Sequence, residues 1–227
     1  MNKENSDSSN MNEILPLLAI ETSEKLCGVS FLINETEYYS AKIFLPHSHS
    51  EKLFELIETL RDNANLKLNE IKSVAVSSGP GSFTGLRIGM AAAKGIAAGI
   101  KIPIIPVPTF EALAFHLSQI LPNGQKFIIA NKANRDEAYF AKFHVKNNNY
   151  IFEEELKILP ITEIKIYESE MLFGNIASNP NKIVSPEPEI VGLWALKFGR
   201  TNIINDFDFL EPNYIKDFIV KEVKKNG

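Results

Sequence analysis

The sequence predicts a mixed α/β protein in which β-sheets are flanked by helices. Three short apolar segments open the chain, and from residue 49 onward segments with helical and strand-like periodicity alternate. Three strands that can pair in antiparallel fashion, followed by alternating helices and strands, are typical of a mixed sheet with helices on its faces. The chain has 227 residues, of which 44% are apolar. It can therefore form one large domain or two small lobes that share a core.

In the first half of the chain, strands are expected where short apolar runs are bounded by turn residues. These runs are Leu15–Ile20, Leu26–Ile33, Glu37–Phe44, Ile71–Ser77 and Ile104–Val107. Helices are expected where apolar residues recur at three- and four-residue spacing. Those segments are His49–Leu60, Phe83–Ala98 and Thr109–Leu117. Ser48 and Glu51 have the spacing of a capping box before the first helix, and Thr109 is the expected N-cap of the third.

The second half reads as a reduced block of strands and one helix. Strands are expected at Phe127–Ala130 and Ala138–Val145, and from Tyr150 the chain returns as a hairpin partner. After an irregular stretch, Pro188 suits the first turn of a last helix that Gly199 ends.

The order of all these elements is that of the actin-like fold, also called ASKHA and ribonuclease H-like. We expect two lobes built on mixed sheets with flanking helices, the second lobe being reduced. Residues 1–13 should form a disordered tail, 14–108 the N-terminal actin-like lobe, and 109–227 the reduced second lobe with a C-terminal segment. Within the second lobe, residues 160–187 look shortened and atypical.

Composition excludes several classes of protein. The formal net charge is −4, which argues against a chain that grips nucleic acid through its own surface, because such domains are usually basic. A single cysteine, Cys27, rules out an intramolecular disulfide and suits a reducing compartment. No apolar run approaches the roughly 20 residues that a membrane span needs, and residues 1–13 lack the apolar core of a secretory signal. We expect a cytoplasmic protein without membrane contact.

The strongest local signal is the glycine-rich string GPGSFTGLR, residues 79–87, where a strand meets a helix. Its glycines allow close backbone approach, and the free amides of a helix start favour an anion. It is not a Walker A loop, because the Gly-Lys-Ser/Thr ending is missing. A phosphate-type loop and a turn that only packs a helix against a sheet are equally compatible with the residues.

A second polar turn, Glu21-Thr22-Ser23, follows the first strand and would face the same cleft. If the two turns retain a vestigial or weak phosphate-binding role, the residues concerned are Glu21, Thr22, Ser23, Gly79, Gly81, Ser82 and Thr84.

Other catalytic and metal-binding patterns are weak. His47, His49 and Glu51 form H-x-H-x-E at a helix start, where residues two apart diverge, so we expect no metal site. No Ser-His-Asp arrangement stands out, G-x-S-x-G is missing, and Cys27 has no obvious base. We expect no catalytic residues.

The helix at Phe83–Ala98 is unusually rich in alanine and glycine. Small residues cover most of its circumference, so one small face can pack on the sheet while another stays open to a second helix. This pattern favours a homodimer or heterodimer formed through that face.

Several motifs together resemble the TsaB family, also called YeaZ. They are LAIETS (18–23), SHSEKL (48–53), SSGPGSFTGLRIGMAAAKGIA (77–97), PVPTFEALA (106–114) and the closing EPNYIK (211–216). The family is required, with the catalytic TsaD subunit and the TsaE ATPase, to place threonylcarbamoyl on N6 of adenosine 37 in tRNAs that read codons starting with A. The resemblance implies a non-catalytic subunit that forms a heterodimer with TsaD and meets tRNA only through the complex.

The resemblance also implies where the partner binds. The family's first two helices contact TsaD, which places the interface on His49, Lys52, Leu53, Leu56, Arg87, Met90, Ala91 and Lys94. TsaD holds a metal through an H-x-x-x-H pair, and the equivalent stretch here, Thr109 to Leu113, carries neither histidine.

This chain departs from the family at two turns, with Glu21-Thr22 for Asp-Thr and Lys132-Ala133-Asn134 for Asp-Ala-Arg. We therefore expect the chain to have no cofactor of its own. The remaining sites for ADP or ATP are a weak one in the chain's cleft and one at the interface with the partner. Two alternatives stay open: a stand-alone nucleotide- or metal-dependent hydrolase of the same fold (glycoprotease-like), and a homodimer when the chain is alone.

Overall fold

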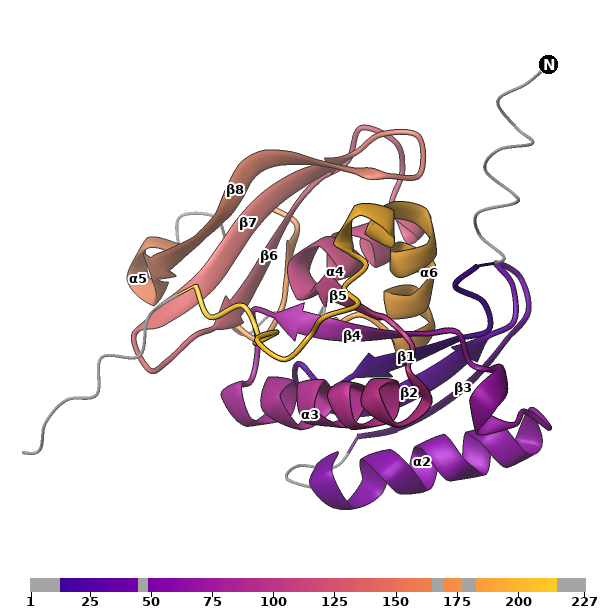
Figure 1. The fold of residues 1–227 in the computed structure, drawn as a ribbon. Coiled ribbons are helices and arrows are strands. Elements are labelled where there is room, and N and C mark those ends of the chain that lie inside the picture. The colour runs from indigo at the N-terminus through magenta and orange to yellow at the C-terminus, as the bar shows by residue number, and fades with distance from the viewer. Residues whose placement is uncertain (1–12, 45–48, 165–169, 177–182, 216–227) are drawn as a thin grey trace, which may run out of the picture.

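The computed structural model describes residues 13–44, 49–164, 170–176 and 183–215, and it contains two mixed sheets (Figure 1). The first sheet has the strand order β3-β2-β1-β4-β5. Its strands are β1 (Leu17–Glu21), β2 (Leu26–Leu32), β3 (Tyr38–Phe44), β4 (Ser73–Gly79) and β5 (Ile104–Pro108). The strands β1, β2 and β3 pair antiparallel in succession, whereas β4 pairs parallel with both β1 and β5.

Helices cover both faces of this sheet. They are α2 (His49–Asn63), α3 (Phe83–Ile100), α4 (Thr109–Ile120) and α6 (Pro188–Phe198). On one face, α2 and α3 pack on Leu18, Ile20 and Val76, and on the other, α4 and α6 pack on Leu17, Ala19 and neighbouring residues. Both faces of the central strands are therefore buried, which explains why these strands are continuously apolar.

The second sheet has the order β8-β7-β6-β9. Its strands are β6 (Lys126–Lys132), β7 (Glu137–Val145), β8 (Tyr150–Pro160) and β9 (Leu172–Phe173), and the short helix α5 (Ile161–Ile164) follows β8. The helix α4 lies between the two sheets (Figure 1). Ala112 and Phe115 face the first sheet, whereas Phe110, Leu113 and Leu117 join the core of the second.

The end of the described chain returns to the first sheet. The helix α6 packs on β1 and β2 near Gly28, and Ile204 pairs with Ile104 at the edge strand β5. Further on, Phe207 and Leu210 pack against the core under α3. Residues 188–210 therefore belong by packing to the first lobe, although they follow the second lobe in sequence.

The elements expected from the sequence are present with small shifts at their ends, and one local detail differs. Thr109 is the first residue of α4 and does not cap it, because its Oγ1 accepts a hydrogen bond from the Gly79 amide instead (3.1 Å). Ser48 of the expected capping box lies outside the described residues, as does the expected tail over residues 1–12.

Candidate functional site

The two polar turns singled out in the sequence lie directly against each other. β1 ends at Glu21 and β4 at Gly79, and because the two strands are parallel neighbours their ends meet at one edge of the sheet. The Ser82 amide donates to the Ser23 carbonyl oxygen (2.6 Å), and the Thr22 hydroxyl donates to the Gly85 carbonyl oxygen (2.8 Å). The start of α3 is thus bonded to the turn after β1.

Close backbone approach explains the glycines of the α3 start. A Cβ added to Gly81 would overlap the Ser23 carbonyl, and one added to Gly85 would overlap the Thr22 carbonyl. Gly79 has a φ of +110°, a region that favours glycine. The packing interpretation of the string therefore accounts for these glycines without a ligand.

Two of the amides near the start of α3 are already engaged where the turns Glu21–Ser23 and Gly79–Gly85 meet, which we call the first corner. The Ser82 side chain caps α3 by accepting from the Gly85 amide (3.3 Å), while the Ser82 amide is bonded to Ser23. The hydroxyls of Ser82 and Thr84 lie on the surface. Phosphate binding by these turns stays a prediction.

Glu21 is fully buried and bound by serine donors. Its Oε1 accepts from the Ser23 amide (2.6 Å) and from the Ser23 hydroxyl, and its Oε2 accepts from the Ser77 hydroxyl. Burial nevertheless dominates, and it raises the pKa of Glu21 to about 7. A buried carboxyl held by internal donors is a structural group of the corner and has no open face for a ligand.

The second lobe contains a similar corner that the sequence analysis missed. Asn131 near the end of β6 is buried, and its Oδ1 accepts from the Asn175 amide (3.0 Å) just after β9. Gly174 has a φ of +116°, and a Cβ there would overlap the Ala130 carbonyl. The available signal was Gly174 after an apolar pair, but the pair is too short to predict a strand.

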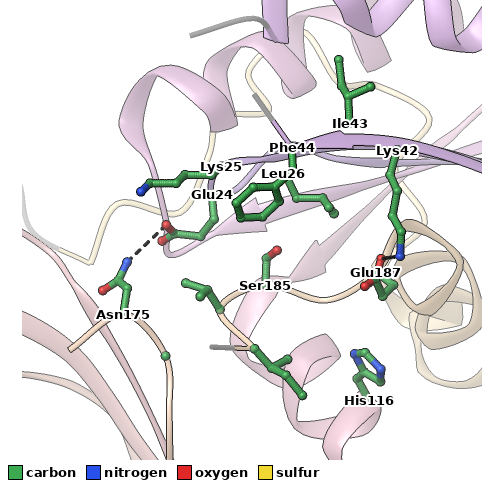
Figure 2. Close-up of a pocket in the computed structure, with 13 residues that line it drawn as sticks. Glu24, Lys25, Leu26, Lys42, Ile43, Phe44, His116, Asn175, Ser185 and Glu187 are labelled. Carbon is green, nitrogen blue, oxygen red and sulfur yellow. Dashed lines mark hydrogen bonds and ion pairs between the residues drawn. The ribbon is translucent and has the colours of Figure 1, made fainter. Parts of the chain in front are cut away.

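A cavity of about 790 Å³ lies beside these two corners, between the lobes (Figure 2). Its walls come from the turn before β2, the end of β3, α4, the turn after β9 and residues 183–187. None of the predicted phosphate-loop residues lines it. No local sequence pattern signals this pocket, because its walls come from five separate segments.

Charged groups stand at opposite ends of the cavity (Figure 2). At one end, Glu24 accepts a hydrogen bond from the Asn175 side-chain amide (3.3 Å). Burial raises the pKa of Glu24 to about 7, with the nearby Glu21 adding to the effect. At the other end, Lys42 is paired with Glu187 (2.5 Å).

The residues predicted to contact a partner fall into two groups. His49, Leu53 and Met90 are buried in this chain's own core, and the imidazole Nε2 of His49 lies 3.0 Å from the Leu26 carbonyl oxygen. The others reach the surface of α2 or α3: Lys52, Leu56, Arg87, Ala91 and Lys94. The interface itself stays a prediction.

Sequence analysis missed one exposed aromatic residue on α2. Phe54 is 52% exposed and lies off the stripe formed by Leu53, Ile57 and Leu60, which faces the core. An apolar residue on the outer side of an amphipathic helix is the signal that could have identified it.

The C-terminal segment holds the start of α3. The Asn213 amide donates to the Ser78 carbonyl oxygen (2.7 Å), and Arg87 Nε donates to the Tyr214 hydroxyl (3.0 Å). The Arg87 guanidinium also lies 3.9 Å from the centre of the Phe83 ring. The predicted interface residue Arg87 is therefore fixed by the chain's own C-terminal segment.

Among the described residues, no group of three or more His, Cys, Asp or Glu side chains comes together as a metal site would require. His47 of the H-x-H-x-E pattern lies outside those residues. The described part of the chain also has no helix that is both long enough and apolar enough to cross a bilayer.

Comparison with known proteins gives consistent matches. Residues 44–158 match the family model described as TsaD: tRNA N6-adenosine threonylcarbamoyltransferase. The chain is 34% identical over 210 residues to the tRNA threonylcarbamoyladenosine biosynthesis protein TsaB of Buchnera aphidicola subsp. Baizongia pistaciae, covering 91% of this chain and 82% of that protein. It is 32% identical over 131 residues to the protein of the same name from Haemophilus influenzae, covering 56% of this chain but only 53% of that protein. The matched part thus spans about half the length of the Haemophilus relative.

A solved structure, YeaZ from Pseudomonas aeruginosa, has the same fold. It superposes with a TM-score of 0.71 at 22% sequence identity, covering 87% of this chain and 98% of that chain. The expected two-lobe α/β fold of the actin-like type is confirmed.

Proposed function

The chain belongs to the TsaB family, and on that premise we propose that it is a non-catalytic subunit for placing threonylcarbamoyl on N6 of adenosine 37 in tRNAs that read codons beginning with A. It acts by forming a heterodimer with a catalytic TsaD-type subunit. The TsaE ATPase joins this assembly, and tRNA is held by the assembly, because the chain's own formal net charge is −4.

The observation that carries the proposal is the outer face of α3. Arg87, Ala91 and Gly95 follow one another at four-residue spacing on the side of the helix away from the sheet. Ala91 and Gly95 are exposed, and a Cβ added at Gly95 or Gly99 would meet nothing within 4 Å. A helix face made of such small residues lets a partner helix approach closely, which favours tight helix–helix packing.

The neighbouring helix α2 extends this surface. Both helices cover the same face of the first sheet (Figure 1), and α2 exposes Phe54 and part of Leu56. Exposed apolar side chains beside a helix face of alanine and glycine are typical of an interaction surface. We define the docking face as Phe54, Leu56, Ala91 and Gly95.

The catalytic site belongs to the partner in this proposal. The two positions equivalent to the TsaD histidines are Thr109, whose hydroxyl is bonded to the Gly79 amide, and Leu113, which is buried in the core of the second lobe. Both side chains are engaged in the packing of α4. Neither offers the nitrogen that a divalent metal would need.

In this proposal, ADP or ATP binds at the interface with the partner. The corner at Glu21 and Gly79 is filled by its own hydrogen bonds, and Glu21 adds a carboxyl where phosphates would lie. These features support a structural role for the corner, which fixes the position at which α3 begins.

A reconstitution assay tests the proposed function. Purified TsaD-type and TsaE-type subunits with this chain, ATP and an activated threonylcarbamoyl donor should form threonylcarbamoyladenosine on tRNA, whereas omission of the chain should abolish the product. The chain alone should hydrolyse neither ATP nor peptides. Product formation without the chain would contradict the proposed function, and robust turnover of ATP or peptides by the chain alone would favour the stand-alone hydrolase instead.

The state of the isolated chain is a second readout. We expect a homodimer through the docking face when the partner is missing, because the exposed apolar residues then have only another copy to cover them. Light scattering should show this dimer dissociating when a TsaD-type subunit is added.

A further inference from the structure

We propose that the cavity between the lobes binds a small organic cation, an ammonium or amidinium group carried on a flat apolar body. The cavity of about 790 Å³ is within the size range of small-molecule sites. This site is separate from the docking face and does not depend on the proposed function.

The cation would be held by Glu24. Its carboxyl lies half-buried in the cavity wall, and among the described residues it is reached by one long hydrogen bond, from Asn175 at 3.3 Å. It forms no ion pair with a described residue. A desolvated carboxylate without a counter-ion gains most from a cation that enters its cavity. Its raised pKa, about 7, reflects the same lack of compensation.

The apolar body would lie against Phe44. This ring is 66% exposed although it lines the cavity, and Figure 2 shows it between Glu24 and Lys42. Leu26 and Val184 add aliphatic surface to the same cavity. An exposed aromatic face next to a carboxylate attracts both flat apolar groups and cations.

An anion is disfavoured in this cavity. Lys42, a cation of the opposite wall, is already neutralised by Glu187 at 2.5 Å. Near Glu24, the buried Glu21 raises the pKa of Glu24 by more than the exposed Lys25, which lines the same end of the cavity, lowers it. A phosphate or carboxylate would therefore meet Glu24 and the nearby Glu21 at one end, opposed by the solvent-exposed Lys25, and at the other end a lysine already paired with Glu187.

His116 offers a further polar contact at the Glu187 end of the cavity. Its Nδ1 forms no hydrogen bond in the described structure, and burial lowers its pKa, so the ring is neutral at pH 7. A neutral imidazole can donate to or accept from a polar substituent of the ligand. The cavity thus combines one carboxylate, one aromatic face and one neutral hydrogen-bonding group.

Benzamidine is the probe for a direct test on the full chain at pH 7.5. Chemical-shift titration should give saturable binding that perturbs residues around Glu24 and Phe44. Benzoate and ADP should bind at least about tenfold more weakly, since each carries negative charge into an acidic wall. Benzamide, the neutral isostere, should bind more weakly than benzamidine by a similar factor.

Two variants assign the contacts. Glu24→Gln keeps the acceptor for Asn175 and should weaken benzamidine binding about tenfold, whereas Glu155→Gln, an exposed change of the same charge in β8, should leave it unchanged. Phe44→Leu should weaken it about threefold. The proposal is overturned if benzamidine fails to saturate by 10 mM, if benzoate or ADP binds the cavity as well, or if the two glutamine variants behave alike.

Discussion

The two corners of the molecule use one arrangement for different purposes. In the first lobe, the turn after β1 packs against Gly81 and Gly85, which follow β4, and in the second lobe the end of β6 packs against Gly174, which follows β9. The first corner is closed by its own serines and starts the long helix α3. The second corner instead contributes Gly174 and Asn175 to the wall of the cavity. Similar packing at two strand ends thus starts the long helix α3 in one lobe and lines a cavity in the other.

Glycine substitutions should give the largest difference in stability between the two corners and the docking face. Gly85→Ala should lower the free energy of unfolding by about 3 to 4 kcal/mol, because the new Cβ overlaps the Thr22 carbonyl. Gly174→Ala should be similarly damaging. Gly95→Ala, where nothing lies within 4 Å, should raise stability by about 0.5 to 1 kcal/mol. Urea unfolding of the three variants provides the measurement, and equal effects at Gly85 and Gly95 would contradict the packing of the first corner.

The buried acid of the first corner should make stability depend on pH. Glu21 has a pKa of about 7 when folded and an ordinary value near 4.5 when unfolded. Below pH 4.5 both states are protonated, so the native state loses stability as pH rises from about 4.5 to about 7 and the loss is complete above 7.

Glu21→Gln removes the ionisable group, and with it this pH dependence, while it keeps an acceptor for Ser23. The variant should match the parent at pH 4.5 and be more stable by about 3 kcal/mol at pH 8. Urea midpoints at the two pH values measure this difference, and an identical gain at both would show that ionisation is not the cause.

The second corner should not tolerate the charge that the first one holds. The Asn131 side-chain amide donates to the Val184 carbonyl oxygen (2.8 Å), and an aspartate would place an oxygen there instead. Asn131→Asp should cost about 2 kcal/mol at pH 8. Asn147→Asp, an exposed turn residue, serves as the control and should be close to neutral in the same thermal or urea assay. Equal stability of the two variants would contradict the assigned role of Asn131.

The smallest effect is expected where the C-terminal segment meets α3. Tyr214→Phe removes the hydroxyl that accepts from Arg87 but keeps the ring against Phe83. The pair is exposed, so the loss should be only about 0.5 to 1 kcal/mol. Hydrogen exchange at the first turn of α3 should become faster, and unchanged exchange there would argue that the segment does not hold the helix start.

Local patterns in the sequence predicted most elements of the fold. The apolar strands, the helix after GPGSFTGLR and the proline at the start of α6 are short-range features, and each is present in the structure. Tertiary contacts determined the side-chain partners that local sequence patterns do not predict. His49 is buried against Leu26 and Thr109 binds Gly79, although nothing in the neighbouring residues signals either partner.

The candidate sites were predictable to different degrees. The small-residue helix α3 was evident because its alanines and glycines are close together in sequence, and its role in docking stays a prediction. The cavity was not, because Glu24, Phe44 and Asn175 come from segments far apart in the chain and acquire a shared environment only on folding.

The most direct test of the central claim is the affinity of this chain for a TsaD-type subunit with and without a charge on the outer face of α3. Ala91 is exposed, so Ala91→Glu should fold normally and weaken the complex by roughly 100-fold, since a carboxylate would be buried in a tight helix–helix contact. Thr162→Glu on α5 adds the same charge at an exposed site in the second lobe and should leave the affinity unchanged. Equal binding of both variants would contradict docking through α3.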